Sequence, residues 1–264
     1  MTVGFSGDVA EYYAKFRRGY PEEVLDFLQD YFALTRDDDV LDLGCGTGQL
    51  ALPLALRVGN VIGMDPEPDM LRLARRAAGE RGIRNTTWVL GADTDVPALG
   101  ALLGRGSPLA MTVIGQALHW MRHEELFRDL LPLFRAGGGV AVIANGTPLW
   151  LQETAWSRVL RDCLERYFDT ELAASCGTAD EDRLRYARAL DGTGFSDVRS
   201  EVISYADELT LSRLLGGLYS AIPEEELPTP AERPRFEAEI RRALPHDGPF
   251  AERVDVCVVV GRSV

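Results

Sequence analysis

Three glycines stand within five residues in the stretch DLGCGTGQL, directly after an apolar run that is typical of a β-strand. Glycine allows a sharp turn from strand to helix, and it lets a ligand lie against the backbone because no Cβ is in the way. A phosphate-binding loop would carry Lys followed by Ser or Thr after the last glycine, but Gln49 and Leu50 stand there. The dinucleotide pattern G-x-G-x-x-G/A does occur, as GTGQLA, so the glycines alone leave a nicotinamide or flavin enzyme open.

Three acidic residues stand at the ends of three successive predicted strands. Asp42 precedes Gly44 by two residues, where it would repel a pyrophosphate and attract a cationic amino group. Asp65 is placed to accept from both ribose hydroxyls of a nucleoside, and Asp93 could accept from an exocyclic adenine amine. Because the carboxyl ends of parallel strands meet at one edge of a sheet, these acids favour a zwitterionic nucleoside ligand over NAD.

Strand and helix patterns alternate along the first 145 residues, which is typical of a parallel, doubly wound sheet. We predict strands at 38–44, 61–65, 86–93, 108–115 and 137–145, and helices at 8–16, 21–34, 50–57, 68–82 and 123–134. Later in the chain we predict helices at 149–168, 181–192, 210–220 and 231–243, and two long strands at 195–209 and 253–261.

These elements predict a single α/β domain over residues 1–264, in which a doubly wound, seven-stranded sheet carries a helical cap. The predicted core takes about residues 36–145, 195–205 and 251–262. The predicted cap consists of the segments 1–34, 146–194 and 206–248.

The ordered motifs VLDLGCGTG, IGMDPEPDML, GADTDVP and IGQALHWM resemble the class I S-adenosylmethionine-dependent methyltransferases. The resemblance is to their small-molecule branch, the methyltransferase type 11-like proteins, which carry His-Trp after the fourth strand. By ordered motifs it covers about residues 8–145. It implies a Rossmann-like methyltransferase sheet and S-adenosyl-L-methionine as the cofactor.

The resemblance also implies where the cofactor's methionine end would bind. The glycine loop, with Gly44, Gly46 and Gly48, would wrap the methionine part, and Asp42 would lie on its amino-group side. Gln116, at the start of the loop after the fourth strand, would line the sulfonium end.

For the adenosine part, the resemblance implies five residues. Asp65 would bind the ribose, and Pro66 and Met70 would pack on the adenine. Asp93 would meet the adenine amine beside the backbone of Thr94.

Near the N-terminus, the family pattern Tyr-Arg-Pro-x-Tyr-Pro appears as FRRGYP, with Arg in place of the first Pro. By resemblance, Arg17 would bind the cofactor carboxylate. Tyr13, on the first predicted helix, could close over the sulfonium as a lid through a cation–π contact.

His119 and Trp120 follow the fourth strand, where the methyl group would be presented. His119 could be the general base for a hydroxyl or amine acceptor, since the pKa of histidine lies near neutral pH. The pair could equally be structural and shape the pocket, because His-Trp recurs in this branch whatever the acceptor is.

The chain carries 28 basic and 41 acidic residues, a net charge of −13, which argues against nucleic acid or an anionic membrane as partner. The four cysteines are widely spaced, without a metal-binding pattern, and the N-terminus has no signal-peptide pattern. No metal is therefore expected, and we predict a cytoplasmic monomer or homodimer that acts on a small molecule.

The sequence thus predicts an S-adenosylmethionine-dependent methyltransferase that transfers a methyl group to an O, N or C atom of a small molecule. A role in bacterial natural product biosynthesis fits the acidic, stand-alone chain with its large cap. The alternatives are an NAD-dependent oxidoreductase and a non-catalytic, methyltransferase-like binding protein.

Overall fold

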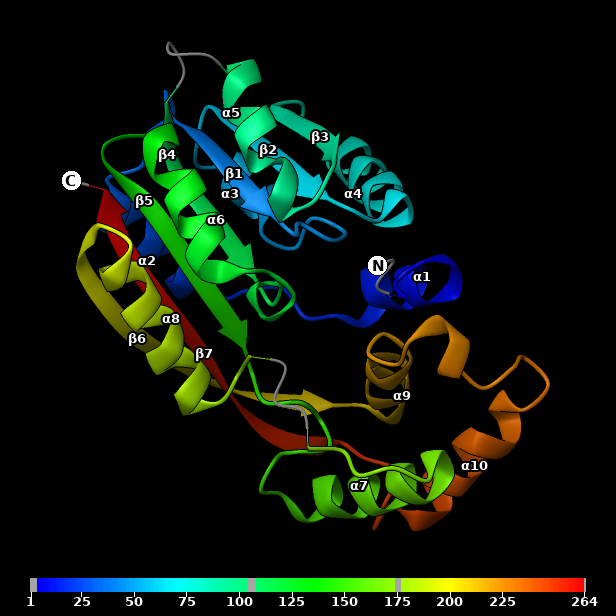
Figure 1. The fold of residues 1–264 in the computed structure, drawn as a ribbon. Helices are drawn as coiled ribbons and strands as arrows, with labels where there is room; N and C mark the ends of the chain where they lie inside the picture. Colours follow the sequence, from blue (N-terminus) through cyan, green and yellow to red (C-terminus); the bar gives the residue numbers. More distant parts are fainter. Residues whose placement is uncertain (1–3, 104–107, 174–176, 264) are drawn as a thin grey trace. The chain divides into compact units, whose positions relative to one another are not determined.

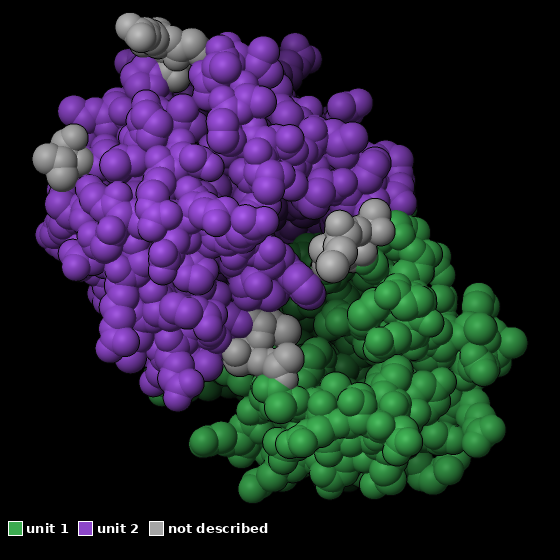
Figure 2. All heavy atoms as spheres, viewed as in Figure 1, with its two compact units in different colours: residues 1–17, 146–176, 204–255 green, residues 18–145, 177–203, 256–264 purple. Residues whose placement is uncertain are grey.

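The computed structural model describes residues 4–103, 108–173 and 177–263, which fall into two compact units (Figure 2). The sheet unit, purple in the figure, takes residues 18–145, 177–203 and 256–264. The helical unit, green in the figure, takes residues 1–17, 146–176 and 204–255.

A seven-stranded sheet with the order β3-β2-β1-β4-β5-β7-β6 organises the fold (Figure 1). Its strands are β1 (Asp39–Leu43), β2 (Asn60–Asp65), β3 (Thr86–Leu90), β4 (Leu109–Gly115), β5 (Phe134–Asn145), β6 (Phe195–Leu209) and β7 (Phe250–Ser263). Strands β1 to β5 pair in parallel, and β7 pairs antiparallel with β5. The order reverses between β1 and β4, so the switch point, where open α/β sheets bind ligands, lies at their carboxyl ends. The predicted doubly wound, seven-stranded α/β fold is confirmed.

The helices of the sheet unit are amphipathic or apolar segments between the strands. They are α2 (Glu22–Phe32), α3 (Ala51–Ala55), α4 (Pro68–Glu80), α5 (Val96–Leu103), α6 (His123–Leu130) and α8 (Asp180–Gly192). Side chains of α5, α6 and α8 form one core cluster with alternate residues of β1 and β2, such as Leu41, Leu43 and Ile62. Period-2 alternation in the strands and period-3.6 spacing in the helices place these apolar faces together.

The helical unit has its own apolar core. Its helices are α1 (Gly7–Phe16), α7 (Ala155–Phe168), α9 (Leu211–Tyr219) and α10 (Arg233–Ala243). Buried side chains of α7, α9 and α10, among them Leu160, Leu214 and Ile240, form this core. Helix α1 packs closely on α9: a Cβ at Gly216 would lie 2.2 Å from Cγ of Phe16.

Some elements differ from the sequence prediction. Helix α5 was not predicted, because VPALGALL is apolar on nearly all sides and shows little helical periodicity. Strand β5 begins at Phe134 and α6 ends at Leu130, so the predicted helix 123–134 extends too far. Helix α7 begins at Ala155, not at 149, and the Thr154 side chain accepts from the Ser157 N–H as its N-cap.

The boundaries of the predicted cap differ as well. Residues 18–34 and 177–194, assigned to the cap from sequence, belong to the sheet unit. The reason is visible for α8, whose Tyr186 and Leu190 are buried in the core cluster of the sheet. Within the described part of the chain, no helix is long and apolar enough to cross a membrane.

The pairing of β5 with β7 depends on glycine at position 139. A Cβ there would lie 2.0 Å from the carbonyl oxygen of Gly261, so the substitution Gly139→Ala must push two strands apart. We expect it to lower the free energy of unfolding by more than ~2 kcal/mol in urea titrations, because overpacking against backbone cannot relax through a side chain.

The matched control is Gly79→Ala on the exposed surface of α4, where a Cβ would meet no heavy atom within 4 Å. This change should raise the free energy of unfolding by about 0.5–1 kcal/mol, since Ala is the better helix former. Equal effects of the two substitutions would contradict the close packing of β5 on β7.

Candidate active site

The glycine loop follows β1 and leads into α3 with left-handed backbone at three positions. The φ angles are 71° at Gly44, 52° at Gly46 and 90° at Gly48. Hydrogen bonds fix the loop: the Gly44 N–H donates to the Met64 carbonyl at 2.8 Å, and the Gly48 N–H donates to that of Cys45 at 2.9 Å. Residues with a Cβ rarely adopt this backbone, so the glycine spacing noted in the sequence is required by the turn.

Asp42 lies in β1 beneath this loop, and its side chain is almost completely buried at 1% exposure. Burial raises the pKa of its carboxyl to about 7, although the Ala51 N–H lowers it by a hydrogen bond, and the nearby charge of Asp65 adds to the rise. Its Oδ2 atom has no hydrogen-bond partner among the described residues. A buried oxygen of this kind is costly unless a donor or a cation meets it, so it marks a position for a ligand.

Asp65 ends β2 and is also buried, at 7% exposure. Its Oδ2 accepts from the Gly46 N–H at 2.8 Å, and its Oδ1 accepts from the Glu67 N–H at 2.9 Å. Burial raises the pKa of this carboxyl, although both backbone N–H groups act to lower it. Asp65 therefore joins the glycine loop to the turn after β2. Each carboxylate oxygen can accept more than one hydrogen bond, so both oxygens retain the capacity to accept from ribose hydroxyls.

The residues predicted for the adenine follow β2 and β3, which are neighbours in the sheet. Met70 is buried in α4, whereas Pro66 is exposed. Asp93 begins the short helix η1 (Asp93–Asp95), and its Oδ2 accepts from the Arg122 N–H at 3.4 Å. Thr94 is exposed on the same turn. Asp42 lies in β1 and Asp65 ends β2, but β3 ends at Leu90, so the predicted third strand, 86–93, extends too far and Asp93 lies in the turn that follows it. All three acids lie toward the carboxyl ends of neighbouring strands, at one edge of the sheet.

The segment after β4 carries the other predicted residues of the sheet unit. Gln116 has a φ of 55°, a left-handed conformation that is rare outside glycine. A Cβ at Gly44 would lie 2.5 Å from Cβ of Ala117, so this segment contacts the glycine loop. His119 and Trp120 form the short helix η2 (Leu118–Trp120) with ring centroids 4.9 Å apart, and Trp120 is 60% exposed.

Tyr13 and Arg17 belong to the helical unit, unlike the other predicted cofactor residues. The Arg17 guanidinium lies 5.1 Å from the centroid of the Tyr13 ring. Its Nη2 donates to the Ser220 carbonyl at 3.3 Å, and its Nε is buried with no partner in the described chain. The structure brings these two residues together, and their contact with the cofactor stays a prediction.

Asn145, at the carboxyl end of β5, is a residue that sequence reasoning did not assign to the site. Its side-chain Nδ2 donates to the Gly19 carbonyl at 3.0 Å, and its Oδ1 is buried with no partner among the residues described. The only signal in the sequence was its place, a polar residue that ends a strand near the switch point.

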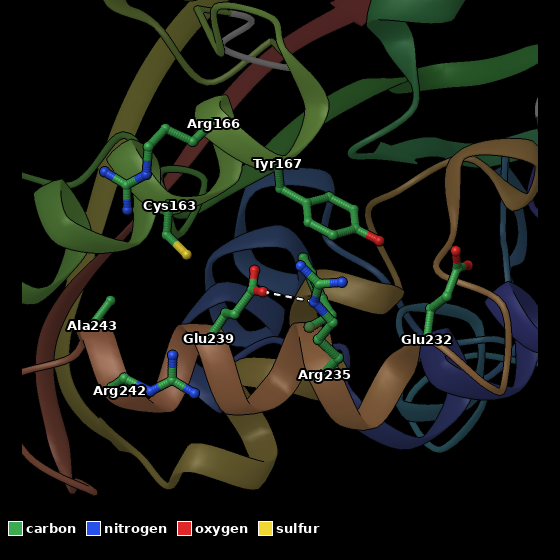
Figure 3. Close-up of a pocket in the computed structure, with 9 residues that line it drawn as sticks. Cys163, Arg166, Tyr167, Glu232, Arg235, Glu239, Arg242 and Ala243 are labelled. Atoms are coloured by element: carbon green, nitrogen blue, oxygen red, sulfur yellow. Dashed lines mark hydrogen bonds and ion pairs between the residues drawn. The ribbon is translucent and has the colours of Figure 1, made fainter.

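The helical unit has a hollow of about 640 Å³ between α7 and α10 (Figure 3). Its lining is Cys163, Arg166, Tyr167, Glu232, Arg235, Phe236, Glu239, Arg242 and Ala243. Arg235 and Glu239 form an ion pair at 3.0 Å, and burial raises the pKa of the Cys163 thiol. The hollow contains none of the predicted cofactor residues, and its charged lining is unlike the largely apolar pockets that organic ligands prefer.

Comparisons with known proteins agree with this geometry. The family profile of a methyltransferase domain matches residues 40–138. The aklanonic acid methyltransferase DauC of a Streptomyces species (strain C5) is 31% identical over 171 residues, which are 61% of this chain and 76% of that protein. A methyltransferase of Mycobacterium tuberculosis, itself uncharacterised, is 28% identical over 166 residues, or 63% of this chain, and the alignment spans 60% of the mycobacterial protein's length.

A solved structure from Anaeromyxobacter dehalogenans, a candidate type II methyltransferase, has the same fold with a TM-score of 0.64. It is 18% identical, and the match covers 94% of this chain and 99% of that one. With the ordered motifs at the switch point and the relationship to DauC, the chain belongs to the class I S-adenosylmethionine-dependent methyltransferases.

The residues of the sheet unit fit the cofactor of that family. Its ammonium group is the kind of partner that the free Oδ2 of Asp42 requires, and the bare glycine loop leaves backbone accessible beside it. Among the residues described, no group of three or more His, Cys, Asp or Glu side chains is arranged to hold a metal ion.

The Asp42 carboxyl should make both stability and cofactor affinity depend on pH. Burial raises its pKa from the ordinary value of 3.8 to about 7 in the folded protein, so its contribution to stability is full below pH ~4 and is lost as the pH rises through 7. We expect Asp42→Asn to raise the free energy of unfolding of the cofactor-free protein at pH 8 and to change it little at pH 4.

Cofactor affinity should rise with pH, whereas stability falls, because the ammonium of the ligand requires the ionised carboxylate of Asp42. Calorimetry with S-adenosylhomocysteine should show affinity about 5- to 10-fold tighter at pH 7.5 than at pH 6 in the parent protein, and no such trend in Asp42→Asn. Parallel pH profiles for the two proteins would remove Asp42 from the binding site.

Proposed function

We propose that this chain is an enzyme that transfers the methyl group of S-adenosylmethionine to an O, N or C atom of a small molecule. The observation that carries the proposal is the buried, unpartnered Oδ2 of Asp42 beneath the glycine loop. A pyrophosphate ligand would be repelled there, whereas the amino group of the methionine part would form a charge-assisted hydrogen bond. This difference between repulsion of a pyrophosphate and attraction of an ammonium group favours S-adenosylmethionine over NAD.

The proposed cofactor contacts run along the carboxyl ends of the strands. The backbone of Gly44, Gly46 and Gly48 would surround the methionine part, and Asp65 would accept from the ribose hydroxyls in addition to its two backbone donors. Gln116 would line the sulfonium end, next to the point where Ala117 contacts the loop.

The remaining proposed contacts concern the two ends of the cofactor. For the adenine we propose packing by Pro66 and Met70 and a hydrogen bond to Asp93, beside the backbone of Thr94. For the carboxylate we propose Arg17, whose Nε lacks a partner within the described residues. Tyr13, in cation–π contact with Arg17, would be the lid residue.

When bound, S-adenosylmethionine supplies an electrophilic methyl group on a sulfonium. The work left to the chain is to align an acceptor in line with that methyl and to exclude water, and alignment alone can contribute about 7–11 kcal/mol to lowering a barrier. His119, in the segment that follows β4, would either take a proton from the acceptor or shape its position.

The acceptor is proposed to be a small organic molecule, and the relationship to an aklanonic acid methyltransferase supports a specialised bacterial metabolite. The net charge of −13 supports a partner other than nucleic acid. The cytoplasmic location and the monomeric or homodimeric state inferred from sequence stay predictions.

Ligand calorimetry tests the proposed cofactor directly. We expect S-adenosylmethionine and S-adenosylhomocysteine to bind and NAD not to bind, because only the first two carry an ammonium group that can donate to Asp42, whereas NAD carries a pyrophosphate that the carboxylate repels. Micromolar binding of NAD without binding of S-adenosylmethionine would reverse the assignment to an oxidoreductase. Cofactor binding with no transfer to any acceptor would favour the non-catalytic alternative.

His119→Ala separates the two roles of that histidine. A pocket-shaping role predicts a weaker acceptor affinity and a pH profile that follows the ionisation of the acceptor, and we expect this outcome because a sulfonium needs little base catalysis when the acceptor ionises by itself. Steady-state kinetics at saturating acceptor measures the difference, with His123→Ala as the matched control.

The base role predicts a different result. Turnover would then fall by about 10²–10⁴-fold in His119→Ala while cofactor affinity is retained, and the rate of the parent enzyme would rise with pH near 6–7. That combination would make His119 catalytic and would overturn the expectation above.

A further inference from the structure

Two side-chain amides stand at the carboxyl ends of adjacent strands, Gln116 after β4 and Asn145 at the end of β5. Each amide nitrogen donates to a backbone carbonyl: Gln116 Nε2 to Asn145 O at 3.3 Å, and Asn145 Nδ2 to Gly19 O at 3.0 Å. Each amide oxygen, Gln116 Oε1 and Asn145 Oδ1, is buried with no hydrogen-bond partner among the residues described.

The orientation of both amides follows from these bonds. Turning either amide by 180° would place its oxygen against a carbonyl oxygen, which repels it, so the nitrogens are fixed and the oxygens are the free ends. Buried polar atoms in native proteins are nearly always paired. Two free acceptors at neighbouring strand ends therefore indicate a ligand with hydrogen-bond donors.

The backbone around the pair is held in a particular shape. Gln116 keeps its left-handed φ of 55° while its N–H donates to the Ile143 carbonyl at 2.8 Å, which continues the β4–β5 ladder. Strain of this kind persists where the surroundings enforce it and concentrates at functional sites. Tyr20, the neighbour of the Gly19 that accepts from Asn145, contacts the end of β4, since a Cβ at Gly115 would lie 2.6 Å from its Oη.

The amide pair also lies next to the proposed cofactor site. Ala117, the neighbour of Gln116, is the residue that contacts the glycine loop at Gly44. The two oxygens carry no formal charge, so they suit a neutral O–H or N–H as well as an ammonium, and they disfavour a carboxylate.

We propose that Gln116 Oε1 and Asn145 Oδ1 bind a hydrogen-bond donor on the methyl acceptor, and that this contact selects acceptors with a hydroxyl or amino group over those with a carboxylate or ketone. The inference rests on the proposed function, since it names the acceptor class of the same site. It is a binding contact, and no bond is made or broken at the amides.

Four naphthalene derivatives test the selection on one scaffold: 2-naphthol, 2-(aminomethyl)naphthalene, 2-naphthoate and 2-acetylnaphthalene. Each is titrated by calorimetry into protein saturated with S-adenosylhomocysteine. We expect the hydroxyl and amino probes to bind at least about 10-fold more tightly than the other two, because only they donate to the amide oxygens.

Substitutions at the pair should remove this preference. Gln116→Met and Asn145→Leu keep the size of the side chain but remove the amide oxygen. In both variants the dissociation constants of the hydroxyl and amino probes should come within about 3-fold of those of the carboxylate and ketone probes. Asn145→Asp should favour the amino probe over the hydroxyl probe by at least about 10-fold, since a carboxylate attracts the ammonium. Gln152→Met is the matched control, because the Gln152 amide donates to Glu252 within the helical unit.

The outcomes distinguish the two proposals. If the parent protein binds S-adenosylhomocysteine, three results would overturn the donor selection alone. These are equal affinity of the protein for all four probes, no binding of any probe, and an unchanged preference in the variants. Failure of the parent protein to bind S-adenosylhomocysteine would overturn the proposed function and this inference together. A circular dichroism spectrum identical to that of the parent protein shows that the fold of each variant is intact; cofactor affinity cannot serve for this purpose, because Gln116 is itself among the proposed cofactor contacts.

Discussion

Two buried carboxylates beneath one glycine loop are the constraint on which the site depends. Asp65 is satisfied, because it accepts from the Gly46 and Glu67 N–H groups and so joins the loop to the turn after β2. Asp42 has a free oxygen, and burial raises its pKa to about 7. Each carboxylate oxygen of Asp65 thus has a backbone donor, whereas Asp42 is under-satisfied, which costs stability until a cation binds.

The position of these acids follows from the topology of the sheet. Strands β1 and β4 are neighbours, yet the chain runs from β1 through β2 to β3 before it returns to β4. The loops after β1 and β4 therefore leave the sheet side by side, and Ala117 contacts Gly44 where they meet. Glycine at 44 is required twice, by its φ of 71° and by this contact.

The helical unit is stabilised by an apolar core of its own and by contacts between its helices. Phe16 packs against Gly216, Arg233 forms an ion pair with Asp8 at 2.8 Å, and Tyr12 lies 4.9 Å from the ring of Tyr219. These contacts fix α1 on α9 and α10 within the unit. Tyr13 lies on this helix and Arg17 caps its C-terminus, so the positions of both depend on residues some 200 positions later in the chain.

The sequence by itself determined two features of the site. These are the glycine loop after the first strand, and an acid at or just after the carboxyl end of each of the first three strands. These features are readable because backbone conformation and period-2 or period-3.6 burial are local properties of a chain. Local patterns failed where they were ambiguous, as in the uniformly apolar α5 and in the glycine-rich start of β5.

Only the tertiary structure decided which polar atoms are paired. That Asp65 holds Gly46, that Asp42 keeps a free oxygen, and that Gln116 and Asn145 turn theirs away from the backbone all depend on contacts between residues 19 to 126 positions apart. The same holds for the membership of α2 and α8 in the sheet unit. Such pairings arise from the packing of distant segments, which no local pattern of residue types encodes.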